Sequence, residues 1–182
     1  MNNILNLEDL RNGCSGILSS FGSFMCDCAI YSFASQGHTS GVALEVLTDN
    51  QRTLKYRVMW TSELTTQMLR SLNDDERATD YGAMGLAVLL VLQLTDYQHF
   101  TVSQKGTGVD FFLFREEPFD ADITHADARL EISGIRKASR TNTIAIRRKH
   151  KMEQVKPSNA TGLDVYISIT EFSKPNSILV TK

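Results

Sequence analysis

Apolar and polar residues alternate along two neighbouring stretches, 41–49 (GVALEVLTD) and 53–61 (TLKYRVMWT). A period of two is typical of a strand with one buried face, and the polar residues between the stretches allow a turn. The pattern therefore predicts an antiparallel hairpin. Residues 1–37 are rich in Ser, Gly and Cys and have no clean period. We expect them to cap the core or to meet a partner.

Two helices are predicted next. Residues 62–72 carry apolar side chains at helical spacing, and Ser62 is the expected N-cap. Residues 73–97 start with acidic side chains, which the positive end of a helix dipole favours, and continue into an apolar body. The apolar run of about thirteen residues, 82–94, is interrupted by Gln93 and is too short to span a bilayer. We expect a central buried helix and no membrane association.

The C-terminal half alternates between strand-like and helix-like segments. Residues 99–104, 108–115 and 126–135 are rich in β-branched and aromatic residues, which favour strands. Residues 139–158 indicate a basic helix that ends before proline, and 163–172 a closing strand. This order predicts an α/β (α+β) fold, with a mixed central sheet flanked by helices.

Length and composition indicate one domain. The chain has 182 residues, of which 42% are hydrophobic and 22% charged, with only 3 prolines, as in globular proteins. We expect a single domain over 1–182, in which 1–75 form an N-terminal extension with the hairpin and helix, and 76–182 form the core.

Location and cysteine chemistry are also suggested by the N-terminal residues. The start of the chain is acidic and has no basic segment leading into an apolar one, so we expect a cytoplasmic protein. Cys14, Cys26 and Cys28 are odd in number and lack a second ligand pair, which argues against disulfides and against zinc. Small buried thiols are the simpler interpretation.

Charge is distributed unevenly. Residues 129–182 contain 11 basic and 4 acidic residues, whereas 1–128 contain 8 and 17. A polyanion is therefore a candidate partner for one face, although a solvated basic helix would give the same pattern. The candidate contacts with nucleic acid are Arg136, Lys137, Arg140, Arg147, Arg148 and Lys149.

Two lone carboxylates, Asp110 and Glu131, interrupt apolar strand-like segments (GVDFFLF and RLEISGI). A carboxylate in such a segment is costly to desolvate unless it is paired, hydrogen-bonded or bound to a metal. On neighbouring strands the two could share one Mg²⁺ or Mn²⁺, the kind of ion that hydrolysis of a phosphodiester uses. Alternatively, Asp110 faces water and Glu131 forms a structural salt bridge with Arg129 or Arg147.

These elements and residues together resemble the restriction-endonuclease-like PD-(D/E)xK nuclease superfamily, over roughly residues 80–172. The resemblance implies that Asp110 and Glu131 are the central metal-binding and catalytic carboxylates, with Asp80 as the acidic residue of the preceding helix and a further metal ligand. It also implies catalytic roles for Lys151 and Gln154 of the basic helix. The GxGxD and LE-[VI]-SG strands are similar to those of uncharacterised prokaryotic members.

One position departs from the family pattern. The lysine that follows the glutamate by two residues is Ser133 here, and serine cannot supply its positive charge. Either Lys151 or Lys149 replaces that lysine from the next helix, or catalysis has been lost while the fold is kept.

Two functions follow as expectations. The first is a Mg²⁺- or Mn²⁺-dependent nuclease or nuclease-like component, in a prokaryotic defence or mobile-element system. The second is an inactive module of the same fold that serves as a protein- or nucleic-acid-binding subunit. A protein partner or a homo-oligomer fits either function.

Overall fold

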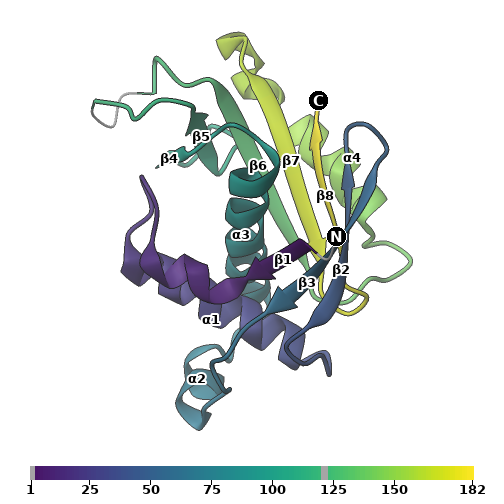
Figure 1. Ribbon diagram of the computed structural model, residues 1–182. Helices are drawn as coiled ribbons and strands as arrows, with labels where there is room; N and C mark the ends of the chain where they lie inside the picture. Colours follow the sequence, from purple (N-terminus) through teal and green to yellow (C-terminus); the bar gives the residue numbers. More distant parts are fainter. Residues whose placement is uncertain (1–2, 120–122) are drawn as a thin grey trace.

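The computed structural model describes residues 3–119 and 123–182, which form one mixed sheet with helices on both faces (Figure 1). The strands are β1 (Asn3–Asn6), β2 (Val42–Thr48), β3 (Thr53–Met59), β4 (His99–Val102), β5 (Phe111–Phe114), β6 (Ala128–Ile135), β7 (Asp164–Glu171) and β8 (Asn176–Thr181). The helices are α1 (Ser19–Ala34), α2 (Thr66–Ser71), α3 (Asp75–Leu94) and α4 (Ile144–Gln154), with the 3₁₀ turns η1 (Leu7–Asn12) and η2 (Lys156–Thr161).

The sheet order is β1-β3-β2-β8-β7-β6-β5-β4. The pairs β1–β3, β2–β8 and β6–β7 are parallel, and the others are antiparallel. The predicted hairpin is confirmed as β2–β3, and the predicted mixed sheet flanked by helices is confirmed as well. The N-terminal strands β1, β2 and β3 and the strands of the C-terminal half, β4 to β8, belong to one sheet.

The helices form two layers around the sheet. On one face α3 packs on β6 and β7 and against α1, while α4 packs on β7 and β6 from the other face (Figure 1). Along β6, Leu130 and Ile132 therefore join the core beneath α3, whereas Ile135 lies in the cluster beneath α4. Because side chains alternate between the faces of a strand, Glu131 and Ser133 face α4.

The predicted central buried helix is confirmed as α3, and the predicted basic helix as α4. The predicted N-cap at Ser62 is wrong: α2 starts at Thr66, and the Thr65 side chain accepts the Met68 N–H. Ser62 is held elsewhere, because its hydroxyl accepts a hydrogen bond from Arg11. The chain also continues past α4 as η2 rather than leaving helical geometry before the proline.

Five elements were not predicted from the sequence: β1, η1, α1, η2 and β8. Cys26 and Cys28 of α1 are buried, as expected, and burial raises the pKa of each thiol to about 12.

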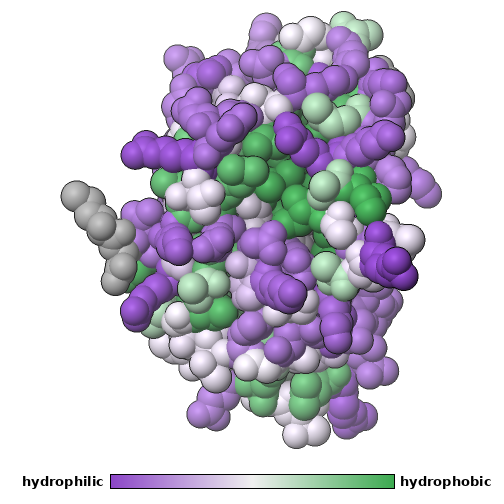
Figure 2. Space-filling view, turned by 90° about the vertical axis from the view of Figure 1, so that its right-hand side faces the viewer, coloured by the Kyte–Doolittle hydropathy of each residue, from purple (hydrophilic) through white to green (hydrophobic). Residues whose placement is uncertain are grey.

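Among the described residues, no helix has both the length and the apolar character needed to cross a bilayer. The side of the molecule turned to the viewer in Figure 2 is mostly hydrophilic, with an apolar patch near its middle.

Glu8 joins η1 to the chain that follows β3. One carboxylate oxygen accepts the backbone N–H groups of Thr61 and Ser62, at 3.0 and 2.9 Å, and the other accepts Arg11 at 2.6 Å. Arg11 in turn donates to Asp27 of α1 at 2.6 Å. Burial alone would raise the pKa of Glu8, but these donors outweigh it and lower the pKa from 4.5 to about 2.

A carboxyl whose pKa is lowered by folding stabilises the protein above its unfolded-state value, and that contribution is lost as the pH falls through the folded-state value. Since the Glu8 side chain is only 19% exposed, we expect Glu8→Gln to lower the free energy of unfolding by about 2–3 kcal/mol near neutral pH. The variant should also lose less stability than the parent between about pH 4.5 and pH 2. Urea unfolding across that range measures both effects. Glu45→Gln, which removes an exposed pair with Lys55, is the control and should change little.

Candidate functional site

The candidate site lies where β5 separates from β6. In the part of the chain that the structure describes, β5 pairs with β6 only from Phe111 to Leu113. Asp110 directly precedes β5, and its backbone N–H donates to the Leu130 carbonyl at 2.9 Å. Within the described chain, β5 offers no backbone partner to the Ile132 N–H. The Asp110 side chain takes that place, because Oδ2 accepts this N–H at 2.7 Å. The separation of the strands thus fixes the Asp110 carboxylate beside β6.

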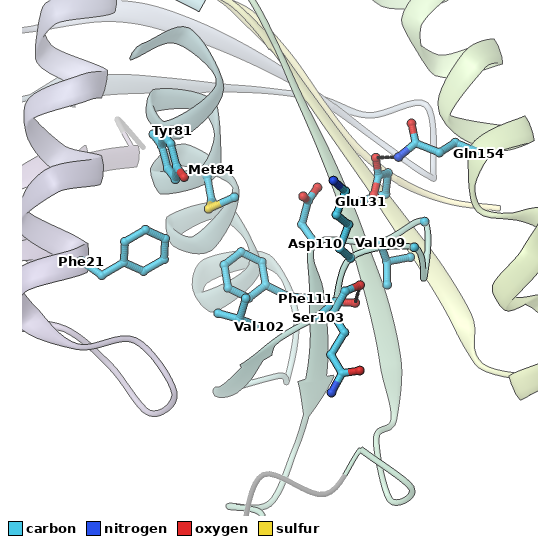
Figure 3. Close-up of a pocket in the computed structure, with 14 residues that line it drawn as sticks. Phe21, Tyr81, Met84, Val102, Ser103, Val109, Asp110, Phe111, Glu131 and Gln154 are labelled. Carbon is cyan, nitrogen blue, oxygen red and sulfur yellow. Dashed lines mark hydrogen bonds between the residues drawn. The ribbon is translucent and has the colours of Figure 1, made fainter. Parts of the chain in front are cut away.

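Glu131 is the residue of β6 that meets this carboxylate. Its side chain is 1% exposed, and Oε1 accepts a hydrogen bond from Lys151. The same oxygen accepts the Gln154 amide at 2.8 Å (Figure 3). The charge of Asp110 acts on Glu131, and both side chains line the same cavity. Burial, and then the Asp110 charge, raise the pKa of Glu131 to about 7, although Lys151 opposes them. The expected pair of converging carboxylates is present, together with the expected lysine and glutamine.

α4 supplies two cations to β6 in register. Lys151 pairs with Glu131, and Arg147 donates to the Ser133 hydroxyl at 3.4 Å and to Asn142 at 2.7 Å. Lys151 and Arg147 are four residues apart on the helix, a rise of about 6 Å. Glu131 and Ser133 are two residues apart on the strand, a rise of about 6.6 Å, so the spacing of the two cations matches the spacing of their partners. Lys151 is therefore the lysine that reaches the carboxylates, and the side of α4 that carries it also places a guanidinium at Ser133.

Asp80 lies near the start of α3, the helix that packs on the face of β6 opposite to α4. The helix comes close there, since a Cβ at Gly134 would lie 2.5 Å from the Thr79 carbonyl oxygen. Asp80 is exposed, yet partial desolvation of its carboxyl raises its pKa, while the Gly134 N–H and the charge of Lys151 lower it. Within residues 3–119 and 123–182, no group of three or more His, Cys, Asp or Glu side chains is arranged to hold a metal ion. Asp80 is thus a charged neighbour of the Asp110–Glu131 pair.

The positive charge of Lys151 acts on all three carboxylates. Burial is the main cause that raises the pKa of Asp110, with a smaller contribution from Asp80, and the ammonium of Lys151 lowers the pKa of all three. Glu131 forms a salt bridge, as one interpretation expected, but its partner is Lys151 rather than Arg129 or Arg147. Lys149, the other lysine considered, is exposed on α4.

The six basic residues proposed as contacts for nucleic acid fall into two groups. Arg136 forms an ion pair with Asp75 at 3.0 Å and lies over the Tyr31 ring, while Arg147 is bound as described above. Both are partly buried. The exposed members are Lys137, Arg140, Arg148 and Lys149. These four have side chains accessible to a polyanion.

A cavity of about 590 Å³ opens beside the carboxylate pair. Asp110, Glu131 and Gln154 line one side, and Phe21 of α1 with Tyr81 and Met84 of α3 line the other (Figure 3). These three residues were missed in the sequence, because their role depends on how α1 and α3 pack and no local pattern marks it. The FFLF segment, in contrast, is buried in the core as expected.

Comparison of the chain with protein-family models, with curated proteins and with solved structures found no match. The resemblance to PD-(D/E)xK nucleases therefore stays a prediction from the sequence, and the site is interpreted from its own geometry.

Proposed function

We propose that the chain is a metal-dependent phosphodiester hydrolase that acts on nucleic acid. The observation that carries the proposal is the convergence of Asp110 and Glu131 at the separation of β5 and β6, with Lys151 on Glu131 and a cavity beside them. A buried and a half-buried carboxylate, a cation and a cavity in one place are features of catalytic sites.

The residues fit a hard divalent cation. Mg²⁺ and Mn²⁺ take oxygen ligands, and protein sites for Mg²⁺ often offer only one or two carboxylates. Two carboxylates held close together repel each other, and the raised pKa of Glu131 reflects that repulsion as well as burial. A bound cation would remove it. Asp110 and Glu131 would hold the ion, and Asp80 would add negative charge nearby.

Such an ion supplies polarisation of a phosphoryl oxygen and a lowered pKa for a bound water. The chain's own residues orient the rest. Gln154 fixes the rotamer of Glu131 through the 2.8 Å hydrogen bond, and Lys151 brings positive charge to the place where phosphate charge develops. Lys151 thereby compensates for the serine at position 133.

The nucleic acid would reach the site along the exposed basic residues. We expect the triple change Arg140→Gln, Arg148→Gln and Lys149→Gln to weaken binding and to flatten its dependence on salt, because each lost phosphate contact removes about one released counterion. Fluorescence anisotropy over a series of salt concentrations measures the slope. Changing Arg52, Lys55 and Arg57 of the β2–β3 hairpin to Gln is the matched control. Equal slopes for the two triple variants would exclude this surface.

The test of the proposal is incubation of the purified chain with labelled DNA and with RNA in Mg²⁺, Mn²⁺ or EDTA. The proposal expects metal-dependent cleavage of at least one of them, lost in EDTA. No cleavage under any condition, by a folded protein, would contradict it.

A second candidate, an inactive module that binds nucleic acid or protein, is favoured by two observations. Ser133 lacks the charge of the family lysine, and the Lys151–Glu131 pair is already satisfied without a metal. Binding without cleavage in the same assay would support it. Under either function we infer a cytoplasmic protein, with a role in prokaryotic defence or mobile elements and with a protein partner or a second copy of the chain.

A further inference from the structure

We propose that the cavity beside the carboxylates receives one unpaired nucleotide, whose base stacks on an aromatic wall formed by Phe21 and Tyr81, so that the substrate is single-stranded nucleic acid. The inference rests on the proposed function, since it takes the occupant to be the nucleic acid whose phosphate meets Asp110 and Glu131. It adds the substrate class and the residues that select it.

The rings of the aromatic wall are partly exposed. Phe33, Phe100, Phe111 and Phe172 are almost fully buried, whereas Phe21 and Tyr81 are only partly covered and line the cavity. Their rings meet edge to face, with centroids 6.0 Å apart. Met84 extends the wall along α3, and Figure 3 shows all three side chains across from the carboxylates.

Close packing of α1 on α3 holds this wall in place. A Cβ at Gly82 would lie 3.0 Å from the backbone of Ala29, so the two helices approach at van der Waals distance. Tyr81 is further supported by Phe24, at 5.0 Å between ring centroids. A preorganised ring loses little freedom when a base stacks on it, and such stacking contributes strongly in proteins that bind single strands.

Size and charge favour a nucleotide over other occupants. The cavity, about 590 Å³, lies in the range of small-molecule sites and would hold a nucleotide rather than a duplex. Lys105 lies on its rim and Arg77 lies about 6 Å from the Tyr81 ring, so cations flank the wall where phosphates of the strand would pass. A base can enter only when it is unpaired, because a paired base has its edge and faces covered.

The experiment measures binding in EDTA, apart from cleavage, with a fluorescein-labelled single-stranded oligonucleotide and with the same strand annealed to its complement. We expect Tyr81→Ala to weaken single-strand binding by about 5- to 150-fold and to leave duplex binding nearly unchanged. Tyr81→Phe should retain the parent's affinity. Phe119→Ala, at a fully exposed ring outside this cavity, is the matched control and should change neither.

Thermal melts check that each variant is folded, and Phe21→Ala replaces Tyr81→Ala if the latter unfolds. Equal loss of single-strand and duplex binding, no loss of either, or a parent that prefers duplex would overturn the inference. Cleavage by the parent with Mn²⁺ and no effect of Tyr81→Ala would overturn the inference alone and leave the hydrolase standing. A selective effect of Tyr81→Ala without any cleavage would support the inference and overturn the hydrolase.

Discussion

Asp110→Asn is expected to lower the rate of metal-dependent cleavage by at least about a hundredfold while the protein stays folded. The change removes the negative charge that would bind the cation. It keeps the oxygen that accepts the Ile132 N–H, so the edge of β6 remains satisfied. Initial rates in Mn²⁺ and the melting temperature in EDTA, measured on the same preparations, separate the two effects.

Asp127→Asn is the matched control for this change. Asp127 also accepts a backbone N–H, from Arg115 at 2.8 Å, but it does not line the cavity beside Glu131. Its substitution should leave the cleavage rate near that of the parent. If Asp110→Asn unfolds the chain, or if both variants cleave like the parent, Asp110 is a structural cap of β6 and nothing more.

Two of the predicted elements have the clearest patterns, a single buried face in the hairpin and a long apolar body in α3. The β2–β3 hairpin alternates, and α3 is long and apolar. α1 was missed because it is buried on several sides and carries Ser, Gly and Cys, which have no helical preference that a pattern could reveal. β8 was missed because its apolar run is only three residues long, Ile178 to Val180, which is too short to set it apart from a loop.

The site was predictable only as far as local geometry determines it. Asp110 directly precedes β5 and Glu131 lies on β6, and the two strands form an antiparallel pair, so their convergence follows from the chain order. Lys151 follows because α4 comes after β6 in the chain and packs on β7 and β6. The position of Asp80 depends instead on the close contact of α3 with Gly134, and the aromatic wall depends on the packing of α1 against α3. Both are tertiary contacts that no sequence pattern marks.

Glu131→Gln distinguishes a metal site from a structural salt bridge. In a metal site, burial and the nearby Asp110 make the ionised Glu131 unfavourable until a cation binds, so Gln should leave the melting temperature in EDTA unchanged or raise it. Lys151 would still have negative charges near it after the change, since its charge also acts on Asp110 and Asp80. A purely structural salt bridge predicts a loss of about 3–5 kcal/mol instead.

The response to metal completes the test. Mn²⁺ at about a hundred times its dissociation constant stabilises a folded protein by about 2.7 kcal/mol, which raises the melting temperature of a chain this size by about 5–10 °C. We expect that rise in the parent and none in Glu131→Gln.

Glu171→Gln is the control, since Glu171 is a buried carboxylate of β7 held by Ser173 and Asn176. It should lose stability in EDTA yet keep the full response to Mn²⁺. A parent that does not respond to Mn²⁺, together with a destabilised Glu131→Gln, would show that Glu131 is there to hold α4 on the sheet, and the hydrolase would fall with the metal site.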